Sequence, residues 1–279
     1  MTFSAFLLSH GLLPKDVYAS SKVQRCPTAT HPRSDNGAYF YDGYRGWCMD
    51  WANDAGVNWW SSGKEWTAAE KRDFEQQRIA QAKRRREGHI KAAQRAAEII
   101  KSCKPDTHNY LRSKQLPEVN GLVTDSGDLV VPMRGLDNSL QGAQIIHWNL
   151  DTREWEKKMI PGMRAKGAVL RIGGHRTAET WLCEGYATGL SVYEAIKRLR
   201  LNASVLVCFS DRNMVQVTND VSGNRFVFAD NDKSQAGLRA AQDTGLPYCM
   251  ADTEGWDAND LHDKAGLMAV CKKIMEARM

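Results

Sequence analysis

The sequence lacks any run of about 18 to 20 uncharged apolar residues, the length that a membrane-spanning helix needs, so we expect no membrane partner. An apolar patch at residues 3–8 has neither a positively charged leader nor a clear cleavage site, so no signal peptide is predicted. The sequence also has no Gly-x-x-x-x-Gly-Lys-Ser/Thr phosphate loop. A helicase activity built on that loop is therefore excluded for these 279 residues.

A disulfide framework is missing as well. The chain has seven cysteines, which is an odd number, and they are scattered without paired spacing. Reduced thiols in a cytoplasm explain this pattern better than a disulfide scaffold does.

Net positive charge is confined to one segment. Residues 71–104 hold eleven Lys and Arg against four acidic residues, a local charge of +7 in a chain of net charge +5, which leaves −2 for the rest. The run from 67 to 102 is rich in strong helix formers and predicts a helix. Its consecutive residues Arg84, Arg85 and Arg86 crowd like charges into about one turn, which is unfavourable unless an anion binds there. We therefore favour contact with nucleic acid over a plain solvated linker.

Apolar patterning divides the chain into four parts. Residues 1–65 combine turn signals with many aromatics and predict a small β-rich module, which the basic helical linker of residues 66–105 joins to the remainder. Residues 106–176 predict a mixed β-rich subdomain. In residues 177–279, apolar strands alternate with helices, which is typical of a parallel sheet with flanking helices. The expected fold class is therefore α/β, or α+β overall.

Acidic residues follow two of the predicted C-terminal strands. Glu184 comes directly after the apolar run Thr180–Cys183, and Asp230 and Asp232 follow the run at 225–229. Because ligands bind beyond the carboxyl ends of parallel strands, we expect these side chains to converge. Alternate residues of an extended segment point the same way, so both aspartates can face one metal ion. Clustered carboxylates suit Mg²⁺, which also recruits substrate phosphates.

A third acidic patch follows the next predicted strand, at residues 247–251. Asp257 and Asp260 lie in this patch and are further candidate ligands of the same site. Gly185 is expected to allow a sharp turn after Glu184. The alternative interpretation is that all these acidic residues only cap strand ends and turns.

The two acidic motifs together resemble the Toprim domain, which occurs in bacterial-type primases, in type IA and type II topoisomerases and in some nucleases. The strings Glu184-Gly-Tyr-Ala-Thr-Gly-Leu-Ser191 and Asp230-Asn-Asp-Lys233 look like the version found in phage and plasmid primases. The resemblance covers residues 178–265 and extends more loosely to two upstream segments, 110–114 and 159–167.

This resemblance implies a DNA primase that synthesises short RNA primers on a single-stranded DNA template from ribonucleoside triphosphates. It implies that Asp230 and Asp232 hold Mg²⁺ or Mn²⁺ and that Glu184 binds metal or transfers a proton. It further implies nucleotide or DNA binding by basic residues before and within the domain, namely Lys157, Lys158, Arg164, Lys166, Arg171 and Lys233. A separate replicative helicase is an expected partner, and a phage or plasmid replication protein acting in the cytoplasm, or in that of a phage host, is the expected setting.

Two other functions stay open beside primase. A Toprim-type nuclease would have the same metal site, so only its activity distinguishes it. A DNA-binding replication accessory protein would be expected to have lost the acidic set, which is intact in this sequence. A topoisomerase is disfavoured because the chain leaves little room for a tyrosine-bearing cleavage domain.

Primases of this type usually carry an N-terminal zinc ribbon. Cys26, His31 and Cys48 are present here, but Trp51 stands where the second cysteine of a Cys-x-x-Cys pair would lie, so no zinc site is predicted. We expect residues 1–65 to form a template-binding module held together by aromatic packing. About one to three of nine aromatics are expected to be exposed and to stack on single-stranded bases; the nine are Tyr39, Phe40, Tyr41, Tyr44, Trp47, Trp51, Trp59, Trp60 and Trp66.

Overall fold

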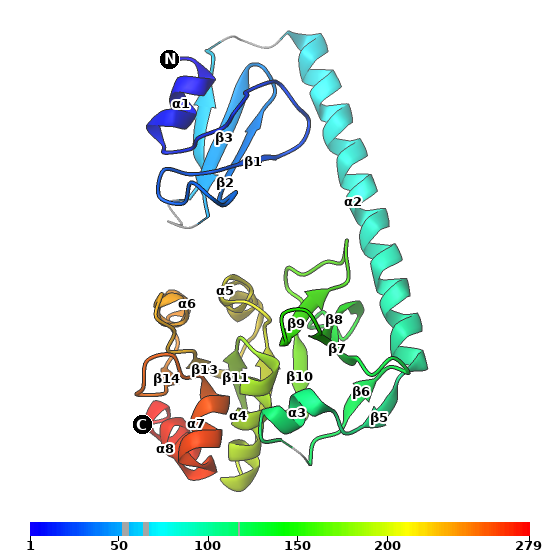
Figure 1. Cartoon of the computed structure of the whole chain (residues 1–279), viewed down its shortest axis with the longest axis vertical. Coiled ribbons are helices and arrows are strands. Elements are labelled where there is room, and N and C mark those ends of the chain that lie inside the picture. Colours follow the sequence, from blue (N-terminus) through cyan, green and yellow to red (C-terminus); the bar gives the residue numbers. More distant parts are fainter. Residues whose placement is uncertain (52–55, 64–66, 117) are drawn as a thin grey trace. The chain divides into compact units, whose positions relative to one another are not determined.

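The computed structural model describes residues 1–51, 56–63, 67–116 and 118–279 (Figure 1). The chain divides into two compact units, residues 1–79 and residues 80–279. Both contain helices and sheets, and the second contains the parallel strands that the sequence predicts, so the expected α/β fold class is confirmed.

The first unit is a four-stranded antiparallel sheet covered by one short helix. The apolar patch near the N-terminus forms this helix, and the Thr2 hydroxyl caps it by accepting a hydrogen bond from the Ala5 N–H. The sheet has the order β1-β2-β3-β4. The elements are α1 (Phe3–Ser9), β1 (Gln24–Cys26), β2 (Gly37–Tyr41), β3 (Arg45–Asp50) and β4 (Asn58–Ser61).

Aromatic packing holds this unit together, as the sequence predicts. The Phe3 ring stacks on Tyr41 with centroids 4.5 Å apart and also contacts Trp60 at 5.3 Å. Cys26 and Cys48 lie in the same apolar cluster, and burial raises the pKa of each thiol to about 11. Both cysteines pack among the aromatic rings as small core residues.

Three of the predicted aromatics are exposed on this unit. Tyr44, Trp51 and Trp59 have exposed fractions of 37%, 42% and 74%, whereas Tyr39 is 2% exposed. Trp66 lies outside the described residues. Among the eight described rings, the number of exposed ones lies within the expected one to three.

Helix α2 (Ala68–Ser102) carries the basic segment. It begins directly after Thr67, as predicted, and its residues from 76 to 87 are exposed. Farther along, Ala92 and Ala96 are completely buried against Val130 and Ile160 of the following subdomain. The second half of the helix is therefore an integral part of the larger unit.

The subdomain after α2 is a five-stranded antiparallel sheet of order β5-β6-β7-β8-β9. One face packs on the end of α2, and the other packs on α3 (Asn109–Ser113) and on the start of the next helix, α4 (Tyr186–Arg198). Its elements are β5 (Lys104–Asp106), α3 (Asn109–Ser113), β6 (Gly121–Val123), β7 (Leu129–Arg134), β8 (Leu140–Asn149) and β9 (Glu154–Met159).

The C-terminal part is a three-layer α/β arrangement around a sheet of order β10-β12-β11-β13-β14 (Figure 1). Strands β11 to β14 are parallel, and β10 joins the edge in the antiparallel sense. The strands are β10 (Leu170–Ile172), β11 (Glu179–Cys183), β12 (Ala203–Val207), β13 (Asn224–Ala229) and β14 (Tyr248–Met250). The helices are α4 (Tyr186–Arg198), α5 (Asp211–Asp220), α6 (Ala236–Thr244), α7 (Ala258–Ala265) and α8 (Leu267–Ala277).

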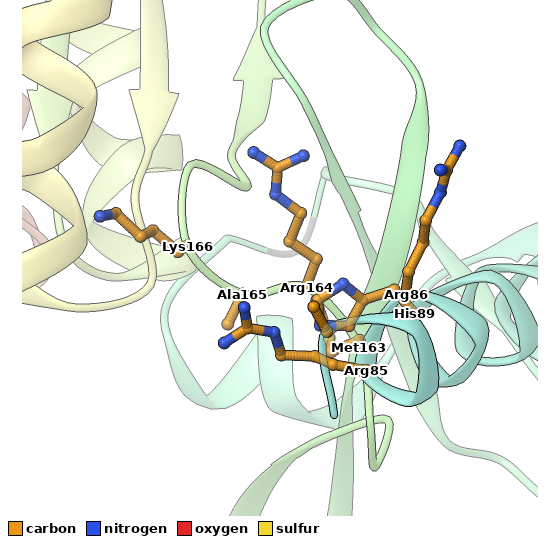
Figure 2. Close-up of a pocket in the computed structure, with 8 residues that line it drawn as sticks. Arg85, Arg86, His89, Met163, Arg164, Ala165 and Lys166 are labelled. Atoms are coloured by element: carbon orange, nitrogen blue, oxygen red, sulfur yellow. The ribbon is translucent and has the colours of Figure 1, made fainter. Parts of the chain in front are cut away.

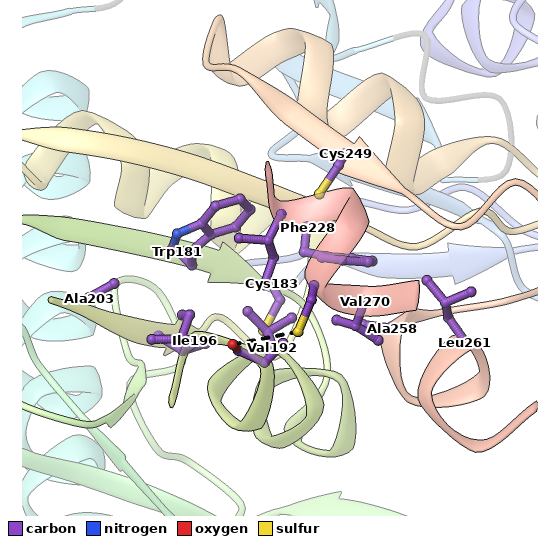
Figure 3. Packing of buried hydrophobic residues seen from close by; sticks show 14 of the residues in the cluster. Trp181, Cys183, Val192, Ile196, Ala203, Phe228, Cys249, Ala258, Leu261 and Val270 are labelled. Atoms are coloured by element: carbon purple, nitrogen blue, oxygen red, sulfur yellow. Dashed lines mark hydrogen bonds between the residues drawn. The ribbon is translucent and has the colours of Figure 1, made fainter. Parts of the chain in front are cut away.

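A separate apolar cluster seals each face of this sheet. Trp181 and Phe228 lie on the face covered by α4, α7 and α8, where Figure 3 shows them packed with Val192 and Val270. Helices α5 and α6 cover the opposite face. Because both faces are buried, the strands are continuous apolar runs, as is usual for parallel sheets.

No helix in the described part of the chain is both long and apolar enough to cross a membrane.

The packing of α2 on the antiparallel sheet predicts unequal effects of one substitution at two adjacent positions. Ala96→Leu should lower the free energy of unfolding by about 1 to 3 kcal/mol, because the added carbons meet a filled core. Ala97→Leu, at an exposed position on the same helix, should change it little. Urea denaturation measures both, and equal effects would contradict the packing described here.

Candidate active site and nucleic-acid interface

Three carboxylates are brought together at the carboxyl edge of the parallel sheet. Glu184 directly follows the central strand β11, Asp230 directly follows β13, and Asp211 is the first residue of α5 after β12. Strands β12 and β13 flank β11 on its two sides. The ladder continues past the strand ends, since the Phe209 N–H donates to the Glu184 carbonyl at 2.8 Å. Parallel pairing therefore places the predicted Glu184 and Asp230 at one edge, together with Asp211.

Glu184 and Asp211 form a carboxyl pair. Burial, the Asp211 charge and a hydrogen bond between the two carboxyl groups raise the pKa of Glu184 to about 7. Burial also raises the pKa of Asp211, while the hydrogen bond from Glu184 opposes that rise. The bond needs one proton, and these directions place it on Glu184.

Asp211 was not predicted as a site residue. The sequence contains a signal for it, because Phe209-Ser-Asp211 follows the apolar strand β12 as Glu184 follows β11. The Ser210 hydroxyl caps α5 by accepting a hydrogen bond from the Asn213 N–H. The segment 209–211 is therefore equally typical of an ordinary helix start. Only the strand order shows that this helix start lies beside Glu184.

Asp230 is the most strongly perturbed of the acidic residues. Burial and the charges of Asp257, Glu184 and Asp211 raise its pKa to about 8. Its Oδ1 atom is buried and has no hydrogen-bond partner among the described residues. Such an acceptor is costly unless a proton or a cation satisfies it.

Asp232 lies in a different environment from Asp230. Its carboxylate accepts hydrogen bonds from the Gly237 N–H at 2.9 Å and the Ala236 N–H at 3.3 Å, at the start of α6, and from the Ser234 hydroxyl. Burial alone would raise the pKa of Asp232, but these hydrogen bonds outweigh it and lower the pKa. Asp232 is thus held as an anion and also orders the turn before α6.

Gly237 is required by the close approach of this turn to Asp230. A Cβ atom at position 237 would lie 2.3 Å from the Asp230 carbonyl oxygen. Gly185, which was expected to allow a sharp turn, has φ −95° and ψ 153°, an extended conformation that any residue adopts, although a Cβ atom there would lie 3.1 Å from Thr188 Oγ1.

One hydrogen bond ties Asp257 directly to the cluster, and a second ties the segment before it. Its Oδ2 accepts a hydrogen bond from Thr188 Oγ1 at 2.9 Å, which ties it to the helix that follows Glu184. The Asn231 Nδ2 donates to the Ala251 carbonyl at 3.0 Å and so joins the 230–232 turn to the segment leading to Asp257. Asp260, by contrast, forms a capping box with Asp257 and an ion pair with Lys264 at 3.2 Å.

The predicted basic residues are divided among several places. The Lys157 charge opposes the rise in the Glu184 pKa, and its Nζ lies 5.5 Å from the centre of the Tyr110 ring, so Lys157 lies near the acidic cluster. Lys158 follows it on β9 and pairs instead with Glu156. Two further predicted residues lie elsewhere, with Lys233 exposed beside Asp232 and Arg171 half-buried and donating to Ser204 Oγ at 2.9 Å.

The remaining predicted basic residues line one cleft, apart from Arg84. Arg85 and Arg86 reach it from α2, and Arg164 and Lys166 reach it from the loop after β9 (Figure 2). Arg84 is exposed but does not line the cleft.

The family comparison decides what the C-terminal part is. Residues 179–267 match the model of the Toprim domain family. This segment is a Toprim domain. The match begins at the first residue of β11 and contains Glu184, Asp211, Asp230 and Asp257, so the predicted resemblance is confirmed over the acidic cluster.

Two solved structures show a distant likeness to the chain. One is a chain in a structure of bacteriophage T7 lagging-strand DNA polymerase interacting with primase domains of two gp4 subunits, with 15% identity and a TM-score of 0.41 over 63% of this chain and 91% of that one. The other is the DnaG catalytic core, with 16% identity and a TM-score of 0.37 over 53% of this chain and 52% of that one. No curated protein matches this chain in sequence.

The donor chemistry of the Toprim cluster suits a divalent cation. Asp230 offers a buried, unpartnered carboxylate oxygen, and further carboxylates lie beside it. No three Asp, Glu, His or Cys side chains of the described residues already form a metal cage. Mg²⁺ is usually bound by one or two carboxylates, waters and substrate phosphates, so such a cage is not needed. Asp230, Glu184 and Asp232 are the residues that would hold it.

The raised pKa values of the Toprim carboxyls predict how stability depends on pH. A carboxyl whose pKa is higher in the folded protein holds its proton more tightly there than in the unfolded chain. Its contribution to the free energy of unfolding is therefore complete below about pH 4 and is lost as the pH rises through 8. Asp230→Asn removes this loss. One pKa unit corresponds to about 1.4 kcal/mol, and the neighbouring carboxyls of the cluster share protons, which reduces the effect of removing one of them. The free energy of unfolding of the metal-free Asp230→Asn variant should therefore be about 2 kcal/mol higher than that of the wild type at pH 8.

Urea denaturation in EDTA at pH 5 and pH 8 measures this difference, which should shrink at pH 5. Asp243→Asn, at an exposed position on α6, is the control and should match the wild type at both pH values. A gain for Asp230→Asn that does not depend on pH would contradict the assignment.

Proposed function

We propose that the chain is a DNA primase that synthesises short RNA primers on single-stranded DNA. The observation that carries this proposal is the gathering of Glu184, Asp211 and Asp230 at the carboxyl edge of the Toprim sheet, with the Lys157 ammonium nearby. Polymerisation of nucleotides needs carboxylates to hold cations and a base to accept a proton. Both kinds of group are present in this cluster.

Primer extension is the attack of a 3′-hydroxyl on the α-phosphate of a ribonucleoside triphosphate, with pyrophosphate as the leaving group. When bound, Mg²⁺ or Mn²⁺ supplies charge stabilisation at the attacking and leaving oxygens. Asp230 and Asp232 serve in this scheme as ligands. Glu184 serves as the proton acceptor once its own proton has left, because its pKa of about 7 is close to neutral pH.

Other parts of the chain have roles in the same proposal. Lys157 lies where a cation would contact a triphosphate bound beside Glu184. The exposed rings of Tyr44, Trp51 and Trp59 on the N-terminal unit serve to stack on unpaired template bases. A replicative helicase is a further partner in this proposal, since residues 1–279 themselves contain no phosphate loop.

Primer synthesis on a defined template tests the proposal. The purified protein is incubated with single-stranded DNA of mixed sequence, four ribonucleotides, one of them labelled, and Mg²⁺ or Mn²⁺. Short labelled RNA should appear on a denaturing gel, and Asp230→Asn should reduce its amount at least about a hundredfold, since it removes a metal-binding carboxylate. Asp243→Asn is the matched control and should retain the wild-type yield.

Two other outcomes would replace this assignment. Shortening of the DNA that requires Asp230, without RNA products, would identify a Toprim nuclease. DNA binding with neither activity, even when a replicative helicase is added, would identify an accessory protein.

A further inference from the structure

Asn213 lies in the first turn of α5, two residues after Asp211, and its side-chain amide makes three hydrogen bonds to the backbone. The Oδ1 atom accepts from the Gly167 N–H at 2.7 Å. The Nδ2 atom donates to the Ala168 carbonyl at 2.7 Å and to the Cys208 carbonyl at 2.8 Å. Both N–H groups of the amide are therefore used, and among side chains of this length only asparagine offers one acceptor together with two donors.

Two of these bonds connect α5 to the segment before β10. That segment is fixed in turn, because Val169 pairs with Arg134 at the end of β7 through two hydrogen bonds of 2.8 and 2.7 Å. Asn213 therefore ties the start of α5 to the antiparallel sheet, which lies outside the matched Toprim segment. A helix start that is bonded to a rigid sheet holds its side chains in a defined position.

The third bond closes a strained turn between β12 and α5. Phe209 has φ 64°, a left-handed conformation that a bulky side chain rarely adopts. Such a conformation persists only where neighbouring contacts hold it. Here the Phe209 N–H donates to the Glu184 carbonyl at 2.8 Å, and the Cys208 carbonyl accepts from Asn213. Removal of the Asn213 amide releases one side of this turn, and Asp211 follows Phe209 by two residues.

Asp211 presents a free carboxylate oxygen to the cluster. Its Oδ1 atom is buried and accepts no hydrogen bond from the residues that the structure describes, and the same is true of Asp230 Oδ1. A buried carboxylate oxygen without a partner is costly unless a cation or a proton satisfies it. The position of Asp211 relative to Glu184 and Asp230 therefore affects how strongly the cluster attracts a cation.

We propose that Asn213 is a positioning residue, which holds the Asp211 carboxylate beside Glu184 and thereby strengthens the binding of a divalent cation at the Toprim cluster. Asn213 does not contact the cation and acts through Asp211. Removal of a side chain that orients a carboxylate near a metal ion typically weakens metal binding by about 10- to 100-fold. The inference rests on the cation site of the proposed function, but not on primer synthesis.

Binding of Mn²⁺ to the full chain, without nucleotide or DNA, tests this inference. The electron paramagnetic resonance signal of free Mn²⁺ decreases as the ion binds, and the part of the binding that Asp230→Asn removes belongs to the Toprim cluster. Asn213→Ala should weaken this binding about tenfold. Asn213→Ser, which removes less of the side chain, should weaken it in the same direction and takes the place of Asn213→Ala if that variant does not fold.

Thr218→Val is the matched control. Thr218 lies on the same helix, is buried, and donates from Oγ1 to the Met214 carbonyl at 2.9 Å, so this substitution also removes a buried side-chain hydrogen bond. It should change Mn²⁺ binding by less than about twofold, whatever its effect on the midpoint of urea denaturation. Equal weakening by Asn213→Ala and Thr218→Val would indicate a general effect of helix stability and would overturn the inference.

The Asp211→Asn background distinguishes action through Asp211 from an independent effect. Asp211→Asn alone should weaken Mn²⁺ binding at least about tenfold. If Asn213 acts through that carboxylate, Asn213→Ala should weaken binding by less than about twofold further in this background. A second tenfold loss there, unchanged binding by Asn213→Ala alone, or no Mn²⁺ binding by the wild type would each contradict the assigned role.

A primer-synthesis assay on the same proteins separates this inference from the proposed function. Mn²⁺ binding that depends on Asn213 in a protein that makes no primers would leave this inference standing and remove the proposed function. Primer synthesis by a protein whose Mn²⁺ binding does not depend on Asn213 would do the reverse.

Discussion

Parallel pairing of β11 with both β12 and β13 is the constraint on which the candidate site depends. Strands that run in the same direction end at the same edge, so Glu184, Asp211 and Asp230 meet although they are far apart in sequence. Bringing like charges together is unfavourable, and the raised pKa values of Glu184 and Asp230 reflect that cost. The apolar layers on both faces of the sheet offset it, with Trp181 and Phe228 fully buried on one of them.

The larger unit separates its charges into two regions. Acidic groups gather at the carboxyl edge of the Toprim sheet, and basic groups gather where α2 meets the loop after β9. The hydrogen bond from Gly167 to Asn213 joins the two regions. A phosphate-bearing substrate needs both, because its backbone is attracted to arginine and lysine while its reacting phosphate needs carboxylate-bound cations.

The N-terminal unit is a small sheet, and large side chains in its core stabilise it. Its core consists of Phe3, Phe6, Leu7 and Tyr39 with the neutral thiols of Cys26 and Cys48. Large aromatic side chains supply much apolar area per residue, which a small domain requires. Other rings of this unit, such as Trp59, lie outside the core and are exposed.

The sequence by itself determined the class of fold, the alternation of strands and helices after residue 177, and the placement of Glu184 and Asp230 at strand ends, because apolar periodicity and strand-end acidic residues are local signals. It missed the short elements α1, β5 and β6, whose lengths give too few repeats to establish a period. Only the tertiary structure decided that Asp211 belongs to the cluster, that Lys158 and Arg171 bond elsewhere, and that Arg85 shares a cleft with Arg164. Those relations depend on the strand order and on which helix face packs against the sheet. Neither can be predicted from a local sequence pattern, because both involve residues far apart in the chain.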